Sequence, residues 1–180
     1  AYNCSPRQIP FLRLKVAKVL QMSKFSLSGH AGKNLLNILE TLPRDDLFQA
    51  APEELVELTM GIFHLQERQR IRLFMRQDSY GRFYSCLVYV PRESFNTDLI
   101  QQMEGVLKDA LHADEVSYST LFSASILARI HFMVRVKDTV NVDVNVKTIE
   151  KKLIEIGTSW RHELNHALVD YYGEAQGVSL

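Results

Sequence analysis

Two histidines one helical turn apart are the first residues of this sequence that suggest a reaction. His162, Glu163 and His166 fit the HExxH pattern of zinc proteases, in which both histidines bind zinc and the glutamate activates a water molecule. On a helix, however, both histidines point away from the apolar stripe, and no further histidine or cysteine follows them as a third ligand. We therefore interpret them as solvated residues of an outer face, and we predict neither a metal site nor a catalytic residue.

The other patterns typical of catalysis or cofactor binding are incomplete. Residues 29–34, GHAGKN, have two residues between the glycines where a phosphate-binding loop has four, and no serine or threonine follows the lysine. Cys86 lies in an apolar strand, so we expect a buried, inert thiol. The dinucleotide-binding glycine fingerprint is missing from the sequence, and we expect no cofactor to bind this segment.

Arginines at alternate positions mark two predicted strands. The candidate interface arginines are Arg70, Arg72, Arg76, Arg129 and Arg135. If both strands turn these residues to one open face of a sheet, they form a cationic platform with an aromatic side chain, as in single-stranded RNA readers. No RNA-binding sequence motif accompanies them, and the acidic second half of the chain would repel phosphate. We therefore favour ion pairing to a neighbouring domain and expect no nucleic acid partner.

The turn between the first two predicted strands is a candidate effector site. Asp78 begins this turn, and Gly81 is free to adopt a positive φ. Because loops at sheet ends often hold ligands, Asp78, Gly81 and Arg82 are the residues we consider for a small effector. The alternative interpretation is a tight turn with a salt-bridged arginine.

The spacing of the apolar residues, which indicates the elements that position these side chains, changes along the chain. Up to residue 66 the apolar residues recur at helical spacing, and from residue 70 they alternate as in half-buried strands. The pattern predicts an α+β fold: N-terminal helices, then a ββαββα sandwich related to the ferredoxin-like arrangement, with a four-stranded antiparallel sheet and a long C-terminal helix. The predicted strands are 70–76, 83–90, 116–122 and 127–136, and the later helices are 96–111 and 147–172.

Three segments follow from this pattern. They are a helical extension (1–66), an α+β domain (67–145) and a long C-terminal helix (146–180). The apolar seam of the last helix steps by three and four residues and is longer than one small sheet can cover. We expect this helix to pack on the sheet and towards a neighbour, with Trp160 and Leu164 at the interface.

Composition limits the classes of protein that fit. The 180 residues are 46% apolar and 23% charged with a net charge of zero, and no apolar run is long enough for a membrane span. Two cysteines cannot form a disulfide scaffold, which favours a reducing compartment. No acidic residue precedes Glu40, and we expect the early basic residues on a solvated helix face or a partner surface. Those basic residues are Arg7, Arg13, Lys15, Lys18, Lys24 and Lys33.

Three stretches of the sequence together resemble a known family. Residues 31–49 contain an Arg-Asp-Asp-Leu-Phe box, residues 68–97 an Asp-Ser-Tyr-Gly-Arg-Phe hairpin followed by Tyr-Val-Pro-Arg, and residues 125–136 the strand SILARIHFMVRV. Their order and spacing resemble the N-terminal regulatory region of the large bacterial NAD-specific glutamate dehydrogenases. The resemblance covers nearly the whole chain.

The resemblance implies that the α+β domain (67–145) is one ACT-like module with flanking helices, taken from a multidomain cytoplasmic enzyme. That enzyme would oxidatively deaminate L-glutamate to 2-oxoglutarate and ammonia with NAD as cofactor, using a catalytic site outside this segment. The implied partners are the remaining domains of the parent chain, further copies in a homo-oligomer, and an amino-acid effector. The alternative function is a stand-alone small-ligand-binding or RNA-binding α+β domain that uses the arginine-lined sheet face.

Overall fold

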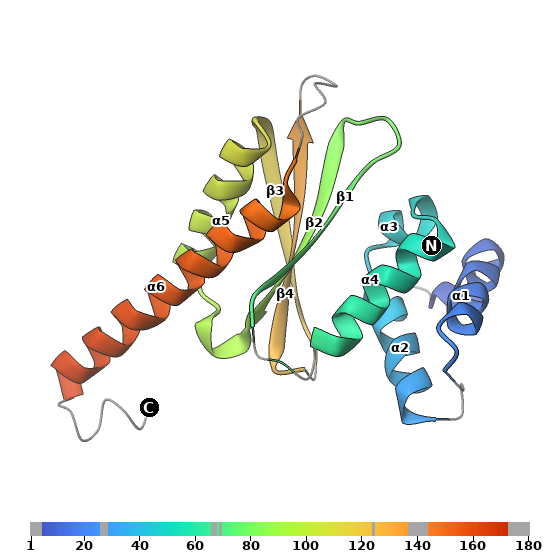
Figure 1. Ribbon diagram of the computed structural model, residues 1–180, viewed down its shortest axis with the longest axis horizontal. Coiled ribbons are helices and arrows are strands. Elements are labelled where there is room, and N and C mark those ends of the chain that lie inside the picture. Colours follow the sequence, from blue (N-terminus) through green and yellow to red (C-terminus); the bar gives the residue numbers. More distant parts are fainter. Residues whose placement is uncertain are drawn as a thin grey trace. The chain divides into compact units, whose positions relative to one another are not determined.

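The chain folds into two compact units, Ala1–Arg68 and Gln69–Leu180, as seen in a computed structural model (Figure 1). The structure describes residues 5–25, 29–65, 68, 70–123, 125–136 and 144–172, with the side chains of the last helix described as far as residue 159.

The first unit is a cluster of helices. A 3-10 helix, η1 (Pro6–Gln8), precedes α1 (Pro10–Met22), α2 (His30–Thr41), α3 (Arg44–Gln49) and α4 (Pro52–Leu65). Prolines at the start of α1 and α4 fit because the first turn of a helix needs no backbone donor at that position. The fully buried leucines at the centre of this unit are Leu12, Leu35, Leu39, Leu47 and Leu55.

The helix α3 was not predicted from the sequence. Its six residues are the Arg-Asp-Asp-Leu-Phe box and Gln49, and they lie between Pro43 and Pro52. A helix of fewer than two turns is too short to show a helical apolar period, so only its acidic first turn, Asp45 and Asp46, indicates a helix start.

The second unit confirms the predicted α+β fold. Two strands, a helix, two strands and a long helix follow one another, and the four-stranded antiparallel sheet has the order β1-β2-β4-β3. The elements are β1 (Arg72–Gln77), β2 (Phe83–Pro91), the 3-10 helix η2 (Arg92–Ser94), α5 (Thr97–Ala110), β3 (Ala113–Phe122), β4 (Leu127–Val136) and α6 (Val146–Tyr172). The predicted start of β1, residue 70, is two residues too early, and the predicted start of β3, residue 116, is three residues too late. The edge strand β3 is largely exposed, so its sequence lacks a clear alternation.

The helices α5 and α6 pack on one face of the sheet (Figure 1). On that face Cys86 of β2 lies opposite Phe132 of β4, and both side chains are fully buried. Met103 of α5 and Leu153 of α6 are also fully buried in the same cluster. Cys86 is thus a buried thiol, as the sequence predicted.

The free edge of β1 is protected by a side chain of α6. The Glu150 carboxylate accepts a hydrogen bond from the backbone N–H of Leu73 at 2.9 Å, and its other oxygen lies 3.2 Å from Nη1 of Arg72. An edge strand with free N–H groups invites pairing with foreign strands. Glu150 therefore blocks this edge and fixes α6 against β1 at the same time.

Candidate functional site

The candidate site is the face of the sheet opposite α5 and α6, which we call the arginine face. In the antiparallel register Arg72 lies opposite Tyr89, and Tyr89 lies opposite Arg129. Residues directly opposite each other share a face, and so do residues two or four apart along a strand. Arg76 and Arg135 therefore belong to the same face, and the structure brings together four of the five arginines singled out in the sequence.

These arginines are already engaged within the module. Arg72 forms the ion pair with Glu150, and its guanidinium lies 6.0 Å from the ring centre of Phe74. Nη1 of Arg76 donates a 3.1 Å hydrogen bond to the carbonyl of Gln77. Arg135 lies 3.8 Å from a carboxylate oxygen of Glu115, and both of these side chains are more than 60% exposed. The face is thus a set of local pairs, which gives little support to a phosphate-binding platform.

Arg129 lies against the one tyrosine of β2 on this face. Burial raises the pKa of Tyr89, and the charge of Arg129 and its hydrogen bond to the phenol oppose that rise only in part. The ring of Tyr89 meets Phe74 edge to face, with ring centres 5.9 Å apart. The rings of Tyr89 and Phe74 therefore pack on each other, whereas an RNA-binding sheet would expose such rings for base stacking.

Sequence reasoning missed a serine–histidine pair on the arginine face. Oγ of Ser85 lies 2.9 Å from Nε2 of His131, in the middle of the sheet, and Ser85 is 7% exposed. A histidine beside a serine is the arrangement that activates a hydroxyl nucleophile. We assign the pair a structural role, because Ser85 is buried within β2 and is not presented to a substrate. The two residues are 46 positions apart, so only the strand register could have revealed the pair.

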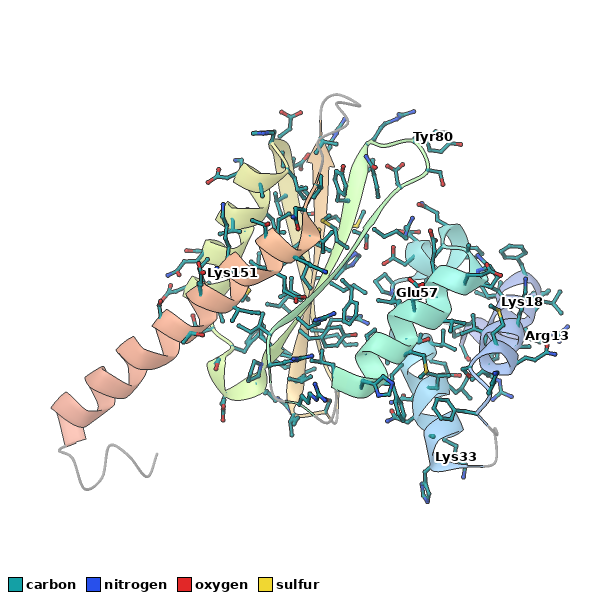
Figure 2. All side chains as sticks on the ribbon, viewed as in Figure 1. Arg13, Lys18, Lys33, Glu57, Tyr80 and Lys151 are labelled. Carbon is teal, nitrogen blue, oxygen red and sulfur yellow. The ribbon has the colours of Figure 1, made fainter. Side chains whose placement is uncertain are left out.

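The candidate effector residues come together in the hairpin between β1 and β2. The Asp78 carboxylate accepts hydrogen bonds from the backbone N–H groups of Tyr80 (3.2 Å), Arg82 (2.7 Å) and Phe83 (2.9 Å). Gly81 adopts a φ of 69°, as expected for its place in the turn. Arg82 lies over the ring of Tyr80, which sits at the hairpin tip (Figure 2). The Asp78 carboxylate is thus hydrogen-bonded to the backbone of its own turn. Effector binding here stays a prediction.

Acid is expected to weaken this hairpin through Asp78. Burial alone raises the pKa of this carboxyl, but the three backbone donors and the charge of Arg82 outweigh it, so the pKa is lowered. A carboxyl group whose pKa is lowered in the folded state stabilises the fold fully above its ordinary pKa of about 4. This stability is lost as the pH falls through the folded-state pKa.

Asp78→Asn should reduce the loss of stability at low pH, whereas Asp78→Ala should lower the free energy of unfolding by about 1–2 kcal/mol at neutral pH. Amide hydrogen exchange of β1 and β2 at pH 3 and pH 6 measures both effects. An unchanged pH dependence in Asp78→Asn would contradict the assignment.

The remaining candidate residues lie elsewhere. Arg70 precedes β1 and lines a cavity of about 160 Å³ with Ser94, Thr158 and Gly157, among other residues. A Cβ at Gly157 would collide with Cδ1 of Ile71, so a larger residue there would require the Ile71 side chain to shift. Trp160 and Leu164 lie on α6, and their side chains fall outside the described residues.

Metal binding gains no support from the part of the chain that the structure describes. Among the residues that the structure describes, no group of three or more His, Cys, Asp or Glu side chains is arranged to hold a metal ion. The side chains of His162, Glu163 and His166 lie outside that part of the chain, so the structure does not test their predicted solvated role. No helix in the described ranges combines the length and apolarity that a membrane span requires.

Comparison with known families places both units in one class of protein. Residues 9–68 match the family model described as glutamate dehydrogenase, helical motif 1, and residues 72–161 match the one described as glutamate dehydrogenase, ACT2 domain. The helical cluster and the α+β sandwich are thus a paired helical motif and ACT domain of glutamate dehydrogenases.

Curated relatives narrow this class. The chain is 44% identical over 173 residues to the NAD-specific glutamate dehydrogenase of Halomonas elongata, and 41% identical over 179 residues to that of Pseudomonas aeruginosa. It is 31% identical over 138 residues to that of Mycobacterium tuberculosis. The matches cover 96%, 99% and 77% of this chain, but only 11%, 11% and 8% of the respective relatives. The chain belongs to the NAD-specific glutamate dehydrogenase family, which confirms the resemblance found in the sequence.

Proposed function

We propose that this chain is a non-catalytic regulatory or assembly segment, from the N-terminal region of a cytoplasmic NAD-dependent glutamate dehydrogenase. The parent enzyme would convert L-glutamate to 2-oxoglutarate and ammonia, with NAD bound and reduced elsewhere in the chain. Two findings support this function: the chain spans about a tenth of its relatives, and its two units match a helical motif and an ACT domain. The arginine face, with its local pairs, suits an interface better than a reaction site.

The length of α6 is the observation that carries the assembly role. Its 27 residues make a helix of about 40 Å, and it runs past the end of its own sheet (Figure 1). Among the α6 side chains that the structure describes, Ile149 and Leu153, in its first part, are buried in the core of the module. The apolar seam continues in the sequence through Trp160 and Leu164, about two and three turns further along the helix than Leu153. An apolar seam of this kind is unfavourable in water. We infer that another domain or a second subunit of the parent enzyme buries it.

The test introduces charge into this seam in the full-length enzyme. Trp160→Asp and Leu164→Asp should reduce the number of subunits per particle, or loosen the docking of this segment, while NAD reduction at saturating glutamate persists in the remaining particles. Ser159→Asp, which adds the same charge beside the seam, is the control and should leave assembly unchanged. Mass photometry gives the subunit number, limited proteolysis reports the docking, and absorbance at 340 nm gives the activity. Unchanged assembly and unchanged protease resistance in both seam variants would refute the assembly role.

A further inference from the structure

A groove in the helical unit has an apolar floor and two arginines at its rim. On α1 its lining residues are Arg13, Val16, Ala17, Leu20 and Gln21, spaced at i, i+3, i+4, i+7 and i+8 along one side of the helix. Arg7 of η1, Phe25 and Leu36 of α2 complete the lining of a cavity of about 560 Å³. The cavity lies wholly within the first unit.

The two rim arginines differ from those of the arginine face. Among the residues that the structure describes, the guanidinium groups of Arg7 and Arg13 have neither an ion-pair partner nor a hydrogen-bond acceptor. By contrast, Arg72 and Arg135 are each paired with a glutamate. None of the residues lining the groove is acidic, and Glu40 is the first acidic residue of the whole sequence. The rim therefore offers two positive charges that no described residue neutralises, next to an apolar surface.

We propose that this groove binds a small amphipathic carboxylate, an anion with an apolar body. The carboxylate would lie between Arg7 and Arg13, because a guanidinium group presents paired donors that match two carboxylate oxygens. The apolar body would lie against Leu20, Phe25 and Leu36, of which Leu20 is 6% exposed and the other two are half-buried. A short acyl chain or a single ring system has the right size for this floor.

The size of the cavity favours a small molecule over a protein segment. Small-molecule sites measure about 300–1,000 Å³ and combine an apolar lining with a few polar groups that fix orientation. The groove meets both conditions with residues of a single unit. The site goes beyond the proposed function and does not depend on it, because it needs nothing from the ACT domain or from α6.

The experiment is a calorimetric titration of octanoate into the full-length protein, with 1-octanol as an uncharged probe of equal chain length. We expect octanoate to bind saturably and octanol to bind at least about tenfold more weakly, since an anionic head paired with arginine contributes at least one decade of affinity. Arg13→Gln should weaken octanoate by about tenfold. Ala17→Glu should abolish its binding, because it places a carboxylate in the groove at an exposed position of α1. Lys33→Gln removes a positive charge from α2 outside the groove and is the matched control, expected within about twofold of the wild type.

Three results would overturn the proposal. They are the absence of saturable octanoate binding, equal affinity for octanoate and octanol, and wild-type affinity in Ala17→Glu. Unchanged far-UV circular dichroism and an unchanged melting temperature establish that each variant is folded. If Ala17→Glu unfolds, the double variant Arg7→Gln/Arg13→Gln takes its place, and wild-type affinity in that variant refutes the site equally.

Discussion

Replacing Phe132 by alanine is expected to lower the free energy of unfolding of the ACT domain by about 3–5 kcal/mol. Phe132 lies in the central strand β4, and its side chain has no exposed surface. It lies opposite Cys86 on β2 and Tyr118 on β3, and its ring centre is 6.0 Å from that of Tyr118. The helices α5 and α6 cover it from one side. The cavity left by alanine could not be filled by small shifts of its neighbours, because these neighbours lie on four packed elements, β2, β3, α5 and α6.

Met133→Ala is the matched control for this prediction. Met133 is the next residue of β4, so its side chain lies on the opposite face and is only half-buried. We expect a loss of about 1 kcal/mol. Urea denaturation followed by circular dichroism, combined with amide hydrogen exchange to separate the two units, gives both values. Equal losses in the two variants would mean that the core is not on the helix-covered face.

The alternation along β4 explains why the sheet could be predicted from the sequence. In Leu127–Val136 the residues facing α5 and α6 are apolar without exception, while those of the other face include Arg129, His131 and Arg135. A period of two over a whole strand fixes which face is buried, and one residue of slippage would place three polar side chains in the core. The fold therefore followed from local pattern, and the family resemblance agreed with it.

The partners of the arginines could not be predicted in the same way. The sequence shows that Arg72 and Arg135 alternate with apolar residues, but not that Glu150 and Glu115 pair with them. Glu150 is 78 positions from Arg72, and only the packing of α6 along β1 brings the two together. Candidate site residues depend on such distant contacts, so the sequence indicated their face but not their partners.

The partners of Lys15 could not be predicted either, because they too are distant in the sequence. The sequence only grouped Lys15 with the other basic residues of the first helix. Its ammonium group donates hydrogen bonds to the backbone carbonyls of Leu47 (2.9 Å), Phe48 (2.8 Å) and Ala50 (2.8 Å). These carbonyls lie at the C-terminal end of α3, where a helix has no backbone donors left for its last oxygens and carries a partial negative charge. Lys15 thus caps α3 from α1, and no sequence pattern links two positions 32 residues apart.

Lys15→Met is therefore expected to lower the free energy of unfolding of the helical unit by about 2 kcal/mol, the second-largest effect we predict. The methionine keeps the length and apolar stem of the side chain but leaves three carbonyls without their donor. Lys18→Met is the matched control on the same helix (Figure 2): its ion pair with Glu53 spans 3.6 Å between side chains that are 57% and 62% exposed. An exposed pair of this kind contributes at most about 1 kcal/mol. Hydrogen exchange of the α3 amides measures the difference, and equal protection of α3 in the two variants would show that Lys15 does not hold this helix in place.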